Sequence, residues 1–274
     1  MKVKIAVVQF ESKKNSPAEN LAKAEKFIAR ASKLKADIIV FPEDFITGTI
    51  SINPKFIDLE GKYKDYFQKL AKKYHIDIVP GSIIEGDKSG TYNTAYYINS
   101  SGRILSSYKK INLWHPEREH VNFGNYLPVF NTKHGKVGLI ICWDLIFPEI
   151  FRKMAKQGVE IVICPSFWSY GDAGIGVKYD KNSEIKLVDS LCVSRAFENE
   201  IALVFCNAAG KLNIGEEKDV FLGHSQITLP FIGAVKKLEH NREEMFIQEI
   251  NTDILKDAEK VYGIKDDLKS RFMY

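Results

Sequence analysis

The sequence has no long apolar segment and little net charge, and each shortage excludes a class of partner. No apolar run approaches the length that a membrane-spanning helix needs. The 274 residues carry 39 Lys and Arg against 35 Asp and Glu, a formal net charge of +4, and the basic residues are scattered along the chain. We therefore expect neither a membrane nor a nucleic acid as a partner.

Cysteine is also scarce, and its spacing excludes the common cysteine frameworks. None of the four cysteines forms a C-x-x-C pair, and all four lie in apolar segments: Cys142, Cys164, Cys192 and Cys206. This pattern argues against a metal site and against a set of disulfides, so we expect a reducing, cytoplasmic location. The apolar run within residues 1–10 is too short for the core of a signal peptide and predicts a first strand instead.

Strands and amphipathic helices alternate in the first part of the chain, and hairpin-like strands follow in the middle. The expected helices are 17–31, 62–74, 148–156 and 186–199. The expected strands are 4–10, 36–41, 76–80, 81–84, 91–98, 104–110, 129–130, 136–142, 159–165, 201–207, 223–230 and 246–250, the last two paired with each other. This mixture predicts a mixed sheet covered by helices on one side.

The remaining segments predict one domain that spans residues 1–274, because no internal repeat and no linker interrupts the pattern. Residues 170–182 are polar and contain glycine, which predicts a loop that serves as a lid or specificity segment. The charged tail, residues 252–274, is too polar to fold alone. We expect it to pack on the body of the domain or on a second subunit.

Cys142 stands where a buried strand is expected to stop. The residues before it, 138–141, are apolar or small, and a helix is expected to begin at Pro148. A side chain at such a strand end is held by rigid structure and still faces the substrate, and the backbone N–H groups that follow can polarise a bound carbonyl. Cysteine is also among the most buried residue types, so a plain core cysteine is the alternative interpretation.

Two more chemically active residues stand at expected strand ends. Glu43 follows the strand 36–41 and Pro42, where it is either a functional carboxylate or one that satisfies free N–H groups at a helix start. Lys109 and Lys110 lie on opposite faces of an extended segment, so one of them points inward or at a site. A solvated lysine pair on an edge strand is the alternative.

Glu43, Lys110 and Cys142 together supply a base, a cation and a thiol, and those parts suffice for acyl transfer. The blocks that hold them are 41–43, 108–113 and 138–149. In this order and at these separations the blocks resemble the Glu-Lys-Cys triad blocks of the nitrilase, or carbon–nitrogen hydrolase, superfamily. Three later segments, 195–199, 207–210 and 223–225, resemble that family's C-terminal blocks.

The resemblance implies a fold and a reaction. The fold is an α/β (α+β) four-layer α-β-β-α sandwich with mixed sheets. The reaction is hydrolysis of a non-peptide C–N bond in a small amide through a Cys142 thioester, with Glu43 as base and Lys110 as the cation. It needs no metal and no organic cofactor. The family's second glutamate maps onto Glu117 by its spacing to a later apolar residue and glycine, with Glu119 as the alternative.

The same resemblance implies the surroundings of the triad. The oxyanion would be held by Lys110 and the backbone N–H of Trp143. Ser166 and Trp168 follow a strand that ends at the same sheet edge as Cys142, so we expect them to contact the oxyanion or the substrate. Family members usually pair through helices near the cysteine, so we expect a homodimer or a higher even-numbered homo-oligomer. Two departures from the family pattern, Asp44 and Asn112, leave the subfamily and the substrate open.

Three alternatives remain open. A nitrilase or an N-carbamoyl-amino-acid amidohydrolase would use the same triad. A cysteine–histidine hydrolase would pair Cys142 or Cys164 with His224, because histidine is the usual partner of a nucleophilic thiol. A binding protein would keep the fold and lack turnover.

Overall fold

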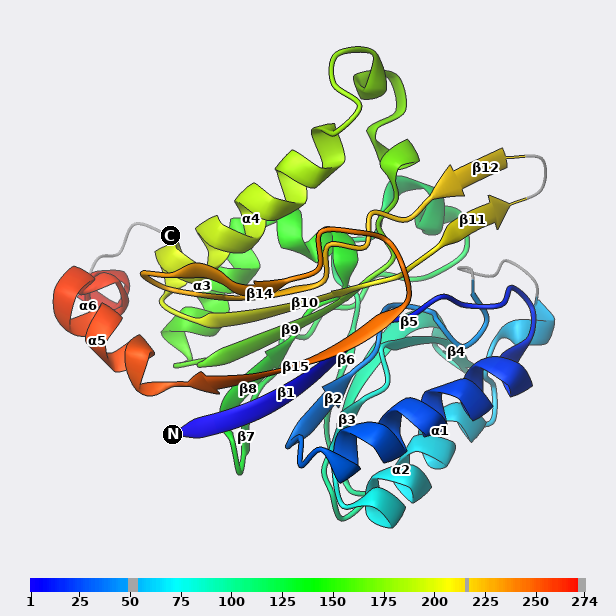
Figure 1. Cartoon of the computed structure of the whole chain (residues 1–274), viewed down its shortest axis with the longest axis horizontal. Coiled ribbons are helices and arrows are strands. Elements are labelled where there is room, and N and C mark those ends of the chain that lie inside the picture. Colours follow the sequence, from blue (N-terminus) through cyan, green and yellow to red (C-terminus); the bar gives the residue numbers. More distant parts are fainter. Residues whose placement is uncertain (49–53, 215–216, 271–274) are drawn as a thin grey trace.

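A computed structural model describes residues 1–48, 54–214 and 217–270. Within these ranges the chain forms two mixed β-sheets that pack face to face, with helices on the outer face of each (Figure 1). The predicted four-layer α-β-β-α sandwich is therefore confirmed. The expectation of a single sheet covered on one side was wrong, because the strands divide between two sheets. No helix in the described part of the chain is long and apolar enough to cross a membrane.

The first sheet has the order β15-β1-β2-β3-β5-β4, and β6 also pairs with β5. Its strands are β1 (Lys2–Gln9), β2 (Ile38–Val40), β3 (Asp77–Val79), β4 (Ser82–Asp87), β5 (Gly90–Ile98), β6 (Ile104–Lys109) and β15 (Glu244–Asn251). β1, β2 and β3 run parallel, and antiparallel strands flank them. The three parallel strands are buried and β-branched, as strands covered on both faces should be.

Helices α1 (Pro17–Lys33) and α2 (Lys62–Tyr74) cover the outer face of this sheet. Pro17 is suited to the first turn of α1, where a missing N–H costs nothing. Ala24 and Ile28 from α1 and Phe67 from α2 are buried in one cluster with Ile39 of β2. Burial of a large apolar side chain of this kind stabilises the fold by about 1.5–3 kcal/mol.

The second sheet has the order β14-β13-β10-β9-β8-β7. Its strands are β7 (Val129–Thr132), β8 (Gly135–Leu139), β9 (Ile161–Ser166), β10 (Ala202–Asn207), β13 (Gln226–Leu229) and β14 (Gly233–Lys237). The central strands β8, β9 and β10 are parallel, and α3 (Pro148–Lys156) and α4 (Ser183–Asn199) cover their outer face. Helix α3 begins and ends at the residues that the sequence predicts.

The inner faces of the two sheets meet in the largest apolar cluster, which includes Ile5 and Val7 of β1 and Leu203 and Phe205 of β10. The closeness of the sheets is visible at Cys206, whose Sγ lies 3.3 Å from the Val8 carbonyl oxygen of the first sheet. The core is therefore continuous between the layers, and loops at the strand ends of both sheets can reach one another.

Some sequence-based expectations were wrong. The segments 223–230 and 246–250 do not pair: β13 pairs with β10 and β14, whereas β15 pairs with β1 in the other sheet. Both segments were recognised as strands, but the sequence does not say which sheet each strand joins. The expected loop 170–182 contains the 3-10 helix η4 (Tyr170–Lys178), with a change of direction at Gly174, where φ is 51°. The hairpin β11 (Lys211–Ile214) and β12 (Glu217–Val220) was not expected.

The described part of the tail folds into α5 (Asp253–Tyr262) and α6 (Ile264–Ser270). The two helices lie beside the end of α4, where the backbone N–H of Ile264 donates to the Glu200 carboxylate at 3.2 Å. Lys265 Nζ also donates to the Glu200 carbonyl oxygen at 3.0 Å. These bonds join the tail to the body of the same chain. Residues 271–274 of the expected tail lie outside the described residues.

Candidate active site

The ends of four segments meet at one edge of the two sheets and bring the predicted triad together. Glu43 lies in the turn after β2, and its backbone N–H donates to the carbonyl oxygen of Ser166, the last residue of β9, at 3.3 Å. Lys110 follows β6, and Cys142 follows β8 by three residues. Because Glu43 follows a strand of one sheet and Cys142 a strand of the other, the site depends on how the sheets pack.

Lys110 makes two ion pairs in this site. Its Nζ lies 2.9 Å from Glu43 Oε1 and 2.6 Å from Glu117 Oε2, and the three side chains are at most 2% exposed. Lys109 instead points outward and lies 3.5 Å from Asp87 Oδ2. Glu119 is exposed. The geometry thus selects Lys110 over Lys109 and Glu117 over Glu119 as members of this cluster.

The charges in this cluster depend on one another. Burial disfavours the Lys110 ammonium, but the carboxylates of Glu117 and Glu43 overcome this and hold the pKa of Lys110 well above its usual value. Burial raises the pKa of Glu43, and the Lys110 charge offsets only part of that rise. Glu43 is therefore a stronger base than an ordinary glutamate, beside a lysine that stays protonated at neutral pH.

Cys142 occupies a sharp turn. It begins the 3-10 helix η3 (Cys142–Ile146) with a φ of 46°, a left-handed conformation that non-glycine residues rarely adopt and that is common at functional sites. The side chain is 9% exposed. Burial raises the pKa of the Cys142 thiol well above its usual value, and the negative charge of Glu43 raises it further, while Lys110 and the backbone N–H of Phe167 lower it. The resting residue is a thiol that needs a base.

Glu43 has one carboxylate oxygen available as that base. Its Oε1 accepts from both Lys110 and Asn93, whereas no described residue donates a standard hydrogen bond to its buried Oε2. The Cys142 thiol lies close enough to this carboxylate to lower the Glu43 pKa as a hydrogen-bond donor. The expected alternative for Glu43, a cap at a helix start, is wrong because Glu43 lies in a turn.

Asn93 of β5 was not foreseen. Its amide nitrogen Nδ2 donates to Glu43 Oε1 at 2.7 Å and to Glu117 Oε1 at 3.1 Å, and the side chain is fully buried. Its backbone carbonyl oxygen accepts from the Lys110 N–H at 2.9 Å. The signal in the sequence was an asparagine within a strand rich in tyrosine and β-branched residues, because a buried amide needs partners.

A second buried network ties the lysine segment to the cysteine segment. Asp144 Oδ1 accepts from the backbone N–H and the side-chain amide of Asn112, both at 2.9 Å. Its Oδ2 accepts from the Tyr108 hydroxyl at 2.7 Å and the Ile141 N–H at 2.9 Å. Arg195 of α4 also donates to the carbonyl oxygen of Leu145 at 3.1 Å. These bonds hold η3 in place, and they account for Asn112, which the sequence showed only as a departure from the family pattern.

Three tryptophan rings form a row centred on Trp143, the residue that follows Cys142 in the chain. Trp143 lies between Trp114, with ring centroids 4.3 Å apart, and Trp168, at 5.7 Å. Trp168 is buried and donates from Nε1 to Glu184 Oε2 at 2.6 Å. Sequence reasoning named Trp143 and Trp168 but missed Trp114.

Other predicted contacts are directed elsewhere. The Ser166 hydroxyl lies 3.4 Å from Cys164 Sγ, so its side chain packs behind the strand end while its carbonyl supports Glu43. Cys164 is fully buried. His224 Nδ1 lies 3.6 Å from Asp189 Oδ1, beside α4. The contacts thus give Cys142 a carboxylate neighbour and place the imidazole of His224 against an aspartate.

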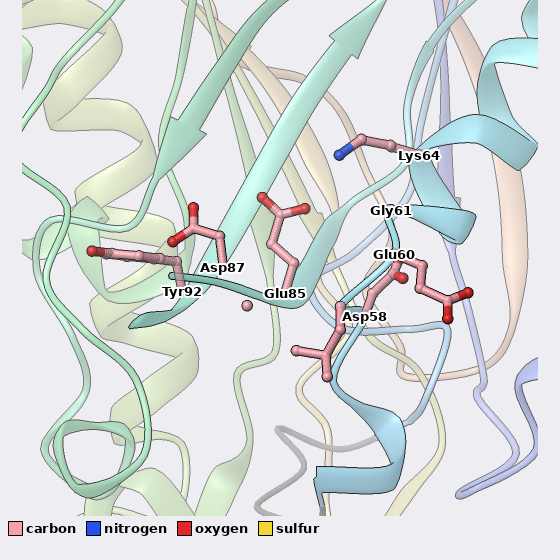
Figure 2. Close-up of a pocket in the computed structure, with 9 residues that line it drawn as sticks. Asp58, Glu60, Gly61, Lys64, Glu85, Asp87 and Tyr92 are labelled. Atoms are coloured by element: carbon pink, nitrogen blue, oxygen red, sulfur yellow. The ribbon is translucent and has the colours of Figure 1, made fainter. Parts of the chain in front are cut away.

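A separate cavity of about 190 Å³ lies at the β4 edge of the first sheet. Glu85 and Asp87 project from β4 on one side, and Lys64 of α2 faces them (Figure 2). Asp58 also lines it, but its carboxylate accepts from the N–H groups of Lys62 and Tyr63 at the start of α2. None of the predicted site residues lines this cavity, so the carboxylates here are separate from those around Cys142.

Comparison with known proteins gives consistent similarities across nearly the whole chain. The carbon-nitrogen hydrolase family model matches residues 4–259. A probable nitrilase of Schizosaccharomyces pombe is 31% identical over 273 residues, 96% of this chain and 93% of that protein. The 2-oxoglutaramate amidase of Bacillus subtilis is 31% identical, with 98% of each chain covered. The crystal structure of Saccharomyces cerevisiae Nit3, a member of the nitrilase superfamily, superposes with a TM-score of 0.82 at 26% identity, covering 95% of this chain and 94% of that one.

Proposed function

The chain belongs to the carbon-nitrogen hydrolase family and is an enzyme of that class, and on this premise we propose that it is an amidase acting on a small linear amide. In this proposal Cys142 is the nucleophile, Glu43 the general base and acid, and Lys110 the cation that holds the oxyanion. The observation that carries it is the Glu43 carboxylate, which has one free oxygen beside a buried thiol and the other bound to Lys110.

The first step forms a bond between Cys142 Sγ and the amide carbon. Glu43 takes the thiol proton on its free oxygen as the sulfur attacks, so a high thiol pKa is no obstacle to reaction. The carbonyl π electrons move to oxygen, and the oxyanion is held by the Lys110 ammonium and the N–H of Trp143. That N–H belongs to the first turn of η3, where helical N–H groups have no partner within the helix. Loss of one such donor costs about 3 kcal/mol of barrier.

The second half of the reaction returns the site to its starting state. The C–N bond breaks as Glu43 transfers its proton to the departing nitrogen, which leaves as ammonia or an amine and gives a thioester on Cys142. Glu43 then removes a proton from water, and the oxygen attacks the thioester carbon. The C–S bond breaks, a carboxylic acid leaves, and the proton returns to sulfur. Glu117 keeps Lys110 in place throughout.

The proposed substrate class is supported by the walls of the site and by the relatives. Cys142 is only 9% exposed and is followed in the chain by Trp143, whose ring lies between those of Trp114 and Trp168, which suits a small, partly apolar acyl group. The Bacillus subtilis relative carries the name of an amidase. A nitrile or an N-carbamoyl amino acid would react at the same triad, and the experiment below separates these classes.

The test is to incubate the protein with pools of small amides, nitriles and N-carbamoyl amino acids, to measure ammonia, and to quench in acid for peptide mass analysis. We expect ammonia from the amide pool and an acyl adduct on the Cys142 peptide, with Cys142→Ala inactive and folded. Cys192→Ala, the same change at another buried cysteine, is the matched control. Turnover that survives Cys142→Ala would overturn the proposal, and turnover that requires His224 would favour the cysteine–histidine alternative.

A further inference from the structure

Asn93 holds a position in the site that the triad chemistry does not explain. It contacts both carboxylates of the cluster and the backbone of its lysine, yet a carboxamide is neither a base nor a nucleophile at neutral pH. The inference below rests on the proposed function and adds a residue to it. Three features of the described cluster carry it: its charge, the partners of each carboxylate oxygen, and the orientation of the amide.

The cluster has two carboxylates and one ammonium, and each of these three side chains is at most 2% exposed. Lys110 can neutralise one of the two negative charges. The second would be left unpaired, and an unpaired buried carboxylate takes up a proton instead of remaining charged. The Nδ2 group of Asn93 points both of its hydrogens at this excess charge, one toward Glu43 and one toward Glu117.

The orientation of the amide follows from its partners. Carboxylates accept hydrogen bonds, so the NH2 end of Asn93 must face them. Its Oδ1 is buried and accepts no hydrogen bond from the described residues. A buried acceptor without a donor costs free energy, and the fold retains it here. The orientation of the amide is therefore set by its hydrogen bonds to the two carboxylates and not by any hydrogen bond to its Oδ1.

The oxygens of the two glutamates have unequal partners. Glu117 Oε1 accepts from Asn93, and its Oε2 accepts from Lys110 and from the Trp114 N–H at 2.7 Å, so both oxygens are occupied. Glu43 Oε1 accepts from Lys110 and Asn93, while Oε2 accepts from neither. The one oxygen of the pair left for a proton therefore belongs to Glu43.

We propose that Asn93 is a positioning residue that holds Glu117 against Lys110 and turns Glu43 so that its Oε2 receives the Cys142 proton. Asn93 acts through these two glutamates and touches neither the sulfur nor the substrate. In the acylation step the proton moves from Cys142 Sγ to Glu43 Oε2 as the S–C bond forms, and Asn93 exchanges no proton. Without the Asn93 amide, the cluster lowers its negative charge by binding a proton. The mechanism requires Glu43 to be free of that proton.

The test compares Asn93→Ala and the isosteric Asn93→Asp with the unaltered enzyme. Hydrogen bonds to a carboxylate lower its pKa. Their loss in Asn93→Ala therefore shifts the acid limb of the kcat/KM pH profile to higher pH by about one pH unit. The added negative charge of Asn93→Asp moves it further. At neutral pH, kcat falls about 10- to 100-fold, a part of what a positioned base contributes. KM stays unchanged, and activity recovers partly at higher pH as Glu43 ionises.

Thr94→Val is the matched control, because Thr94 is the next residue of β5, is equally buried, and has a hydroxyl that makes no hydrogen bond with the residues that the structure describes. We expect its pH profile to match that of the unaltered enzyme. Folded Asn93 variants with an unshifted acid limb would overturn the inference, as would variants that fail to fold, since Asn93 would then be a structural residue. Activity in Cys142→Ala would instead refute the proposed function, so the two failures are distinguishable.

Discussion

Two clusters in the described part of the molecule each bring two glutamates and one lysine together, and they differ in where the lysine ammonium lies. At the site, Lys110 lies between Glu43 and Glu117 and bonds to both. At the end of α4, the carboxyl groups of Glu200 and Glu259 face each other, and Lys265 donates its Nζ to the Glu200 backbone oxygen instead. Each cluster has two glutamates and one lysine, but the ammonium lies between the carboxylates at the site and against a backbone oxygen at the tail, and the site also has the Asn93 amide.

The consequence is seen in the pKa values. At the tail, burial and a hydrogen bond that protonated Glu200 donates to Glu259 raise the pKa of Glu200 to about 7, and burial lowers the pKa of Lys265. The two carboxyl groups of the tail thus share a proton near neutral pH. At the site, the carboxylates hold the pKa of Lys110 well above its usual value. At the site, an ammonium lies between the two carboxylates and the Asn93 amide donates to both, so charge-assisted hydrogen bonds offset part of the cost of burial.

The largest expected effect follows from removing the ammonium of the site. Lys110→Met leaves Glu43 and Glu117 without a cation and removes an oxyanion donor, so we expect kcat to fall about 10³-fold. Ammonia release under saturating substrate measures it. The pair should then behave like the tail pair, with one proton retained near neutral pH.

Lys265→Met is the matched control for that comparison. It removes a lysine that donates to one backbone oxygen, a hydrogen bond that contributes about 1 kcal/mol to the unfolding free energy. We expect kcat to be unchanged and Tm to fall by about 2 °C. Equal losses of activity in the two variants would show that the position of the ammonium does not matter and would break the comparison.

The smallest expected effect is the pH dependence of the stability of the tail helices α5 and α6. Because the folded-state pKa of Glu200 is raised to about 7, its stabilising contribution is present at low pH and is lost as pH rises through about 7. The lowered pKa of Glu259 acts in the opposite direction and only at acid pH. Lys265, Lys269 and Glu160 also act on this cluster electrostatically.

We therefore expect hydrogen exchange in α5 and α6 to accelerate between pH 6 and pH 8, after correction for intrinsic exchange. Glu200→Gln keeps a hydrogen-bond donor toward Glu259 at every pH, and it should flatten this dependence. Activity per folded molecule should be unaffected. A steep dependence that persists in Glu200→Gln would mean that another group controls the tail.

Much of the fold was predictable because local patterns determine strands and helices. Residues 62–74 and 148–156 form the helices that their apolar spacing and Pro148 predict. The strand partners of 226–229 and 244–251 were not predictable. Each strand pairs with one that is distant in sequence, and the two strands belong to different sheets. Residues 170–178 were expected to be a loop, because their 3-10 turns carry no apolar periodicity.

The members of the site were easier to predict than their support. Glu43, Lys110 and Cys142 were marked by chemistry and by position at strand ends, and the structure brings them together. Asn93 was hidden because a single amide in a strand has no motif, and its role depends on two glutamates that are distant in sequence. Trp114 likewise joins the aromatic row only through the fold.

The central claim is that the free oxygen of Glu43 takes the proton of Cys142, and the rate of Cys142 alkylation by iodoacetamide as a function of pH tests it most directly. Both the unaltered enzyme and Glu43→Gln are measured by peptide mass. We expect the unaltered enzyme to react faster as pH passes the raised Glu43 pKa. Glu43→Gln should react about 100-fold more slowly at neutral pH and gain rate only in alkali, where a buried thiol loses its proton unaided. Equal rates for the two proteins across the pH range would contradict the account.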